Sequence, residues 1–124
     1  MTSLAHVNIR TADLERSVAF YRDVLGLSSA AAATRPGSPD HVWMSDEEGK
    51  PCIHLQRTNS AAQSGDHAGM NHLALACANP EAWREKLSAM AIEFQETEFT
   101  AAGMLQFNLL DPDSVRIELL FEAQ

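Results

Sequence analysis

Residues 4–27, LAHVNIRTADLERSVAFYRDVLGL, place a strand pattern directly before a helix pattern. Up to Arg10, aliphatic and polar side chains alternate, which is typical of a strand with one buried face, because successive strand side chains point to opposite faces. Over residues 13–25 the apolar side chains recur at helical spacing, and Asp13 or Thr11 can cap the start of that helix. The stretch therefore predicts a strand followed by an amphipathic helix that covers the strand's aliphatic face.

The chain repeats this order of elements once. Three further strand patterns complete the first half, at residues 28–34, 41–44 and 52–57. After a small, polar stretch, the second half shows a strand at 71–76, a helix from Pro80 to about Met90, and strands at 92–98, 104–110 and 115–121. Such a duplication predicts an α+β fold with a first module at residues 1–58, a linker at 59–69 and a second module at 70–124.

Composition narrows the classes of function. The 124 residues are 45% hydrophobic and 21% charged, which fits one small soluble domain. The sequence has no run of about 18 apolar residues and no secretory signal pattern, so we expect a cytoplasmic protein without a membrane partner. The net charge of −8 disfavours nucleic acid as a partner. Cys52 and Cys77 are expected to be reduced.

The first and last strand of each half carry a side chain of metal-ligand type on their less apolar face. These side chains are His6, His54, His72 and Glu118. A spacing of 66 residues separates the two first-strand histidines, and 64 residues separate His54 from Glu118, so both pairs are nearly in register with the duplication. Imidazole and carboxylate suit a divalent ion such as Zn²⁺, Fe²⁺, Ni²⁺ or Mn²⁺. The pattern indicates one metal site, and the alternative is four unrelated side chains with structural roles.

Three stretches of the chain resemble the vicinal oxygen chelate superfamily: residues 4–27, MNHLALAC at 70–77 and DPDSVRIELL at 111–120. That superfamily includes glyoxalase I, methylmalonyl-CoA epimerase, extradiol dioxygenases, fosfomycin-resistance transferases and bleomycin-resistance proteins. The resemblance implies a glyoxalase-like fold, in which two βαβββ modules form cupped mixed sheets around a cavity. It also implies one divalent metal ion, because the family's ligand positions match His6, His72 and Glu118.

The position of His54 separates the family's branches. Glyoxalase I and the epimerase have Glu or Gln there, whereas fosfomycin transferases and extradiol dioxygenases use only the His, His, Glu triad. His54 is therefore a fourth candidate ligand. The resemblance implies a metal-dependent enzyme that acts on a small substrate with vicinal oxygens, with a lyase or isomerase favoured over an extradiol-type dioxygenase. Glu118 or His54 is the expected proton carrier, and Asn8 and Arg10, in phase with His6, are the expected substrate-binding residues.

The resemblance also supports a second class of function, a non-catalytic small-molecule or antibiotic-binding protein of the bleomycin-resistance type. In either case we expect a homodimer, because family members commonly complete their sites across two chains. His41 and His67 are weaker candidates for an acid–base histidine beside the metal. Four larger side chains either line the pocket or belong to the core: Trp43, Met44, Met104 and Phe107.

Overall fold

The computed structural model describes residues 4–31, 37–58, 70 and 72–122. The chain divides into two compact units, residues 1–62 and 63–124. The first unit contains β1 (Val7–Thr11), α1 (Leu14–Ala19), a π-helical turn η1 (Phe20–Val24), β2 (Ser28–Ala31), β3 (His41–Ser45) and β4 (Pro51–Arg57). The second contains β5 (Leu73–Cys77), α2 (Pro80–Ala89), β6 (Gln95–Phe99), a 3-10 turn η2 (Thr100–Ala102), β7 (Met104–Leu110) and β8 (Arg116–Glu122).

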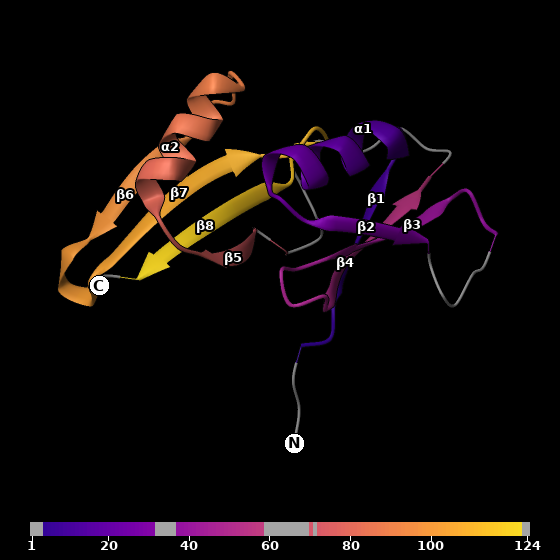
Figure 1. Cartoon of the computed structure of the whole chain (residues 1–124), viewed down its shortest axis with the longest axis horizontal. Coiled ribbons are helices and arrows are strands. Elements are labelled where there is room, and N and C mark those ends of the chain that lie inside the picture. The colour runs from indigo at the N-terminus through magenta and orange to yellow at the C-terminus, as the bar shows by residue number, and fades with distance from the viewer. Residues whose placement is uncertain (1–3, 32–36, 59–69, 71, 123–124) are drawn as a thin grey trace. The chain divides into compact units, whose positions relative to one another are not determined.

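Each unit is built around one four-stranded mixed sheet (Figure 1). The strand orders are β1-β4-β3-β2 and β5-β8-β7-β6, so both units have the same topology. In each sheet the first strand pairs in parallel with the last, and the other neighbours pair antiparallel. The predicted α+β class and the twice-repeated order of strand, helix and three strands are confirmed.

Both predicted helices have the caps that the sequence indicated. Asp13 accepts a hydrogen bond from the Arg16 N–H at 3.0 Å, and Asn79 accepts one from the Ala82 N–H at 3.2 Å, directly before Pro80. Each cap satisfies a backbone donor that the first helical turn leaves unpaired. The helix predicted over residues 13–25 is present, but its second half is wound as the π-helical turn η1.

Three strands begin two or three residues later than predicted, and β8 begins one residue later, at Arg116. β1 and β5 begin at Val7 and Leu73, because each is an edge strand whose pairing starts opposite Ile53 of β4 or Ile117 of β8. His6 and His72 therefore stand just before their strands.

β6, predicted from residue 92, begins at Gln95. The Ile92 N–H instead donates to the Leu87 carbonyl at 2.9 Å, and Ala91 has a φ of 55°. These features close the C-terminal end of α2. Ile92, at which the strand was predicted to begin, therefore belongs to the cap of the helix.

One face of each sheet is buried under its own helix. In the first unit Ile9, Ile53 and Leu55 are buried together with Leu14 and Tyr21 of the helical segment. In the second, α2 lies along the sheet face that carries Phe107, and the Arg84 guanidinium lies 5.4 Å from the centre of that ring (Figure 1). The opposite faces carry the polar side chains predicted there.

The turn before each last strand has the same construction in both units. The Asp46 carboxylate accepts the Glu48 and Lys50 N–H groups at 3.0 and 2.9 Å. The Asp111 carboxylate likewise accepts the Asp113 and Val115 N–H groups, both at 2.8 Å. The two acidic turns of the sequence are thus equivalent structures, which supports a duplicated origin of the fold. None of the described helices is long and apolar enough to cross a membrane.

Candidate functional site

In the second unit, His72 and Glu118 lie together on the face opposite α2. The Glu118 side chain is only 8% exposed, and its Oε2 contacts Nε2 of His72. The Gln106 amide Nε2 donates to the other carboxylate oxygen, Oε1. Asn108 in turn donates its side-chain amide to Gln106 Oε1 at 3.2 Å. A buried carboxylate is stable only when its oxygens have partners, and here both oxygens have one.

In the first unit, three histidines and a tryptophan form a cluster of rings on the equivalent face. The His54 ring stacks on Trp43, with centroids 4.6 Å apart and an interplanar angle of 14°. The ring centres of His6 and Trp43 lie 4.5 Å apart, with the rings at 80° to each other, and the His6 ring centre lies 6.2 Å from that of His54. His41 lies 5.0 Å from His54 on the neighbouring strand.

Both ring nitrogens of His54 are hydrogen-bonded. Its Nδ1 lies 3.1 Å from the side-chain amide nitrogen of Asn8, and its Nε2 lies 2.8 Å from Nδ1 of His41. A metal ion could bind His54 only in place of one of these contacts.

The strand registers show which residues of the two units are equivalent. His54 stands between Asn8 and Trp43 on its neighbouring strands, and Glu118 stands between Ala74 and Asn108. His41 lies two residues before Trp43 on the same face, just as Gln106 lies two residues before Asn108, so His41 and Gln106 are equivalent. In each unit this diagonal neighbour hydrogen-bonds the last-strand candidate. Gln106 and Asn108 were not among the predicted site residues, although they alternate with buried residues of β7 and so lie on the site face.

Arg10 lies on the same face of the first sheet as His54. Its backbone position is opposite Gln56, which in turn pairs with His41, so these residues form one row across three strands. Arg10 is exposed, and within the described residues its guanidinium makes no ion pair or hydrogen bond. Gln56 accepts the second amide proton of Asn8 at 3.4 Å. The row therefore places the Arg10 cation beside hydrogen-bonding groups.

Cys52 shares the strand β4 with His54, and its surroundings favour the protonated thiol. Burial, together with the negative charge of Asp46, raises the pKa of its thiol. Its Sγ lies 3.6 Å from the Met44 carbonyl oxygen, to which the thiol donates. Neither Cys52 nor Cys77 is in a disulfide.

Within each unit the structure brings predicted site residues together, His72 with Glu118 and His6 with His54 and Asn8. No three His, Cys, Asp or Glu side chains among the described residues form a cluster that could hold a metal ion. His67 and the predicted linker lie outside the described residues.

The candidate pocket-lining residues divide into two groups. Met44 and Phe107 are fully buried in the cores of their own units, so the core interpretation is the correct one for them. Trp43 and Met104 are half-buried. Each lies on the face of its own sheet that points away from the helix.

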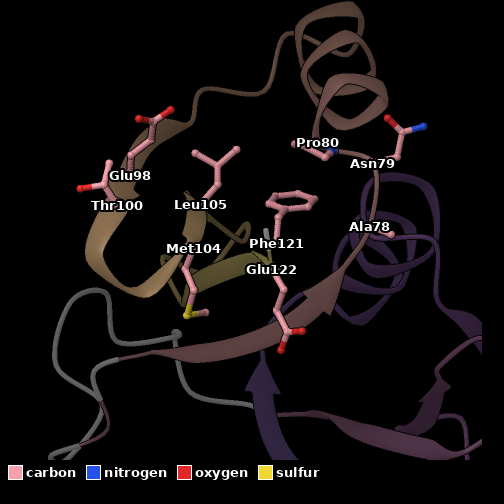
Figure 2. A pocket seen from close by; sticks show the side chains of 10 residues that line it. Ala78, Asn79, Pro80, Glu98, Thr100, Met104, Leu105, Phe121 and Glu122 are labelled. Carbon is pink, nitrogen blue, oxygen red and sulfur yellow. The ribbon is translucent and has the colours of Figure 1, made fainter. Parts of the chain in front are cut away.

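Two hollows of the second unit lie away from the predicted ligands. One, of about 750 Å³, lies beside the start of α2 and is lined by Pro80, Leu105 and Phe121 among others (Figure 2). Figure 2 shows Leu105 and Phe121 side by side near Pro80, while the Glu122 side chain points to the other side of the sheet. The second, of about 820 Å³, lies at the far end of α2 and includes Arg116. None of the predicted ligands lines either hollow.

Comparison with known proteins gives one family and several structural neighbours. The model of the Glyoxalase/Bleomycin resistance protein/Dioxygenase superfamily matches residues 3–119. A glyoxylase/bleomycin resistance protein/dioxygenase domain from Frankia sp. EAN1pec aligns with a TM-score of 0.81 at 17% identity, covering 100% of this chain and 94% of the neighbour. No curated protein sequence gives a significant match.

Two further neighbours carry more specific descriptions. A mutant of the fosfomycin resistance protein FosX from Listeria monocytogenes, complexed with Mn(II) and 1S,2S-dihydroxypropylphosphonic acid, has a TM-score of 0.76 at 16% identity and covers 99% of this chain and 94% of its own. Lactoylglutathione lyase from Agrobacterium tumefaciens has a TM-score of 0.68 at 16% identity, with 98% and 94% coverage. At these identities the neighbours establish the fold alone.

Proposed function

Because the chain belongs to the Glyoxalase/Bleomycin resistance protein/Dioxygenase superfamily, we propose that it is a metal-dependent enzyme acting on a small molecule with two neighbouring oxygen atoms. The proposed ligands of one divalent transition-metal ion are His6, His72 and Glu118. The observation that carries this proposal is the contact of the buried Glu118 carboxylate with Nε2 of His72. The metal-bearing FosX structure supports the choice of a metal-dependent function.

The donor set fits such an ion. Imidazole nitrogen and carboxylate oxygen are the donors that Zn²⁺, Fe²⁺, Ni²⁺ and Mn²⁺ share. Gln106 donates to one oxygen of Glu118 and so leaves the other oxygen directed at His72. A buried carboxylate oxygen in that position needs a proton donor or a cation next to it. His6 occupies, in the first unit, the position before the first strand that His72 occupies in the second.

We leave His54 out of the proposed ligand set, because Asn8 and His41 occupy both of its ring nitrogens. Three ligands would leave coordination positions for the substrate, as in catalytic rather than structural metal sites. The identity of the metal follows from none of these residues alone, since the donor set suits all four ions.

In the proposed reaction, the protein's own residues transfer a proton next to a negatively charged oxygen of the substrate. When bound, the metal would polarise the substrate oxygens as a Lewis acid. Glu118 is the proposed proton carrier, and His54 is the alternative carrier on the other module. Arg10 and Asn8 would hold an anionic or polar part of the substrate, since both are exposed on the site face. A lyase or isomerase needs only these steps, so we favour it over oxygen insertion.

We further propose that both modules act together and that the active form is a homodimer. Sedimentation should give about twice the mass of one chain at micromolar protein concentration. A single species with the mass of one chain would contradict the dimer without affecting the ligand proposal.

Elemental analysis of protein purified without added metal tests the function. We expect about one transition-metal ion per chain in the wild type and less than about a tenth of that in Glu118→Ala. The Glu48→Gln variant is a suitable control, because that exposed carboxylate lies in the turn before β4. If the wild-type protein contains no metal and binds small molecules without converting them, it belongs instead to the non-catalytic binding class.

A further inference from the structure

Three side chains on the site face of the first unit form a directed series of hydrogen bonds. The Asn8 side-chain nitrogen lies 3.1 Å from His54 Nδ1, and His54 Nε2 lies 2.8 Å from His41 Nδ1. An amide nitrogen donates and cannot accept a hydrogen bond. His54 Nδ1 must therefore be the unprotonated, accepting nitrogen of its ring.

The remaining protons follow from this first one. A neutral His54 that accepts at Nδ1 carries its proton on Nε2, and it donates that proton to Nδ1 of His41. His41 must then carry its own proton on Nε2. Both rings are thus in the Nε2–H form, which is also the more stable form of a neutral histidine in water.

The orientation of the Asn8 amide agrees with that of the Gln56 amide. Its second proton points to the Gln56 side-chain oxygen at 3.4 Å. Turning the amide over would direct the Asn8 oxygen at both His54 and the Gln56 oxygen, and two facing oxygens repel each other. Gln56 thereby helps to hold the direction of the whole series.

We propose that Asn8 sets the tautomers of His54 and His41, so that His41 presents its Nε2–H as a donor that binds an oxyanion, such as a carboxylate of a small ligand. His41 is half-buried, and within the part of the chain that the structure describes, its Nε2 makes no hydrogen bond. The Arg10 guanidinium, which has no ion pair among the described residues, belongs to the same row of side chains. A positive charge and an N–H donor in one row on the same sheet face are suited to a carboxylate.

The hydrogen bond between the equivalent pair of the second unit, Gln106 and Glu118, has the opposite direction. There the amide protons run from Asn108 to Gln106 and on to Glu118, toward the last-strand residue. In the first unit the donated protons run from Asn8 to His54 and from His54 to His41, so the last-strand residue, His54, is itself the donor to its diagonal neighbour. The second-unit series supports an acceptor, the Glu118 carboxylate, whereas the first-unit series ends in a donor. This role of His41 goes beyond the proposed metal chemistry, and all of its residues belong to one unit.

The tautomers can be measured directly on metal-free protein. Long-range ¹H–¹⁵N correlation spectra, recorded at a pH where the ¹⁵N shifts show neutral rings, distinguish Nδ1–H from Nε2–H histidine. We expect the Nε2–H form for His41 and His54 in the wild type and in Arg10→Gln. In Asn8→Asp the carboxylate accepts instead of donating, so both rings should change to Nδ1–H. An Nδ1–H form in the wild type, or unchanged tautomers in folded Asn8→Asp, would overturn the proposal.

Ligand binding tests the consequence at His41. With oxalate as the probe and metal-free protein, His41→Leu should weaken binding about tenfold or more, since a hydrogen bond to a charged group is lost. His41→Gln should restore much of the affinity, because its amide can accept from His54 and still offer an N–H. Equal affinity of His41→Leu and wild type would contradict the binding role. Since no metal is present, failure of the metal proposal would leave both results unchanged.

Discussion

At the scale of single residues, the most informative side chain is Gln106, which was not a predicted site residue. Its amide donates to Glu118 and accepts from Asn108, so it fixes the orientation of a buried carboxylate. Hydrogen-bonding partners of a metal ligand orient it and tune its affinity. Gln106 is therefore a positioning residue for the proposed metal.

Replacing Gln106 with methionine keeps the length of the side chain and removes the donor. We expect metal affinity to fall by about 10- to 100-fold, because Glu118 loses the contact that orients it. Competition with a chromophoric chelator measures the affinity, and the visible spectrum of the Co(II)-loaded protein reports the ligand geometry. Thr97→Val, on the paired residue of β6, should change neither. An affinity of Gln106→Met equal to that of the wild type would show that Gln106 has no such role.

Ser114 has a backbone conformation that favours glycine. Its φ is 67°, and the equivalent turn of the first unit has Gly49 at a φ of 81°. Because a side chain is strained in this region, Ser114→Gly should stabilise the protein by about 0.5–1 kcal/mol. Urea denaturation measures this difference. A lower midpoint for Ser114→Gly would show that the Ser114 side chain contributes more than its strain costs.

Glu15 links the fold's stability to pH. Its hydrogen bond with the Arg57 guanidinium lowers the pKa of its carboxyl from 4.5 to about 2. Since the folded-state pKa is the lower one, the contribution is present above about pH 4.5 and is lost as the pH falls toward 2. The difference in thermal midpoint between wild type and Glu15→Gln should shrink over that interval. Glu47→Gln is the control, and a difference that stays constant from pH 5 to pH 2 would exclude this linkage.

At the scale of elements, the first strand and the first helix are joined by a buried network around Thr11. Thr11 is fully buried, and its hydroxyl accepts from the Asp13 N–H at 3.1 Å and from the Ser17 hydroxyl at 2.9 Å. The side chain thus connects the end of β1 to the start of α1. Its burial on the helix-covered face follows from the strand alternation, but its role as a junction does not.

Thr11→Val keeps the shape and removes the acceptor. We expect a loss of about 1–3 kcal/mol, because the buried Ser17 hydroxyl and the part-buried Asp13 N–H lose this acceptor. Ser17→Ala should cost less, since it removes one donor together with its bond. Chemical denaturation of both variants checks the order. The prediction is wrong if Thr11→Val is as stable as the wild type.

Sequence periodicity identified the elements better than their ends. The helix caps at Asp13 and Asn79 were predictable because capping is a local interaction within three residues. The starts of β1 and β5 were not, because they depend on where β4 and β8 offer a partner. The π-helical turn at Phe20–Val24 also left no signal, since the apolar spacing of that segment is compatible with an ordinary helix.

At the scale of the whole molecule, the duplication was predictable, and it has a meaning beyond the fold. The two sheets have the same order and equivalent registers, so His54 and Glu118 occupy corresponding positions. Alternation placed the candidate residues on the correct faces. It could not predict that His41 and Gln106 contact them, because a diagonal contact depends on strand register and on side-chain rotamers. The hydrogen bonds then give the two corresponding residues different roles.

The central claim is that one ion binds to His6, His72 and Glu118, and calorimetric titration of metal-free protein with Zn²⁺ tests it most directly. We predict about one site per chain in the wild type and in His54→Ala, and loss of that site in each of His6→Ala, His72→Ala and Glu118→Ala. Thermal unfolding of the same samples establishes that each variant is folded. A wild type that binds no ion, or folded Glu118→Ala that binds as tightly as the wild type, would contradict the claim.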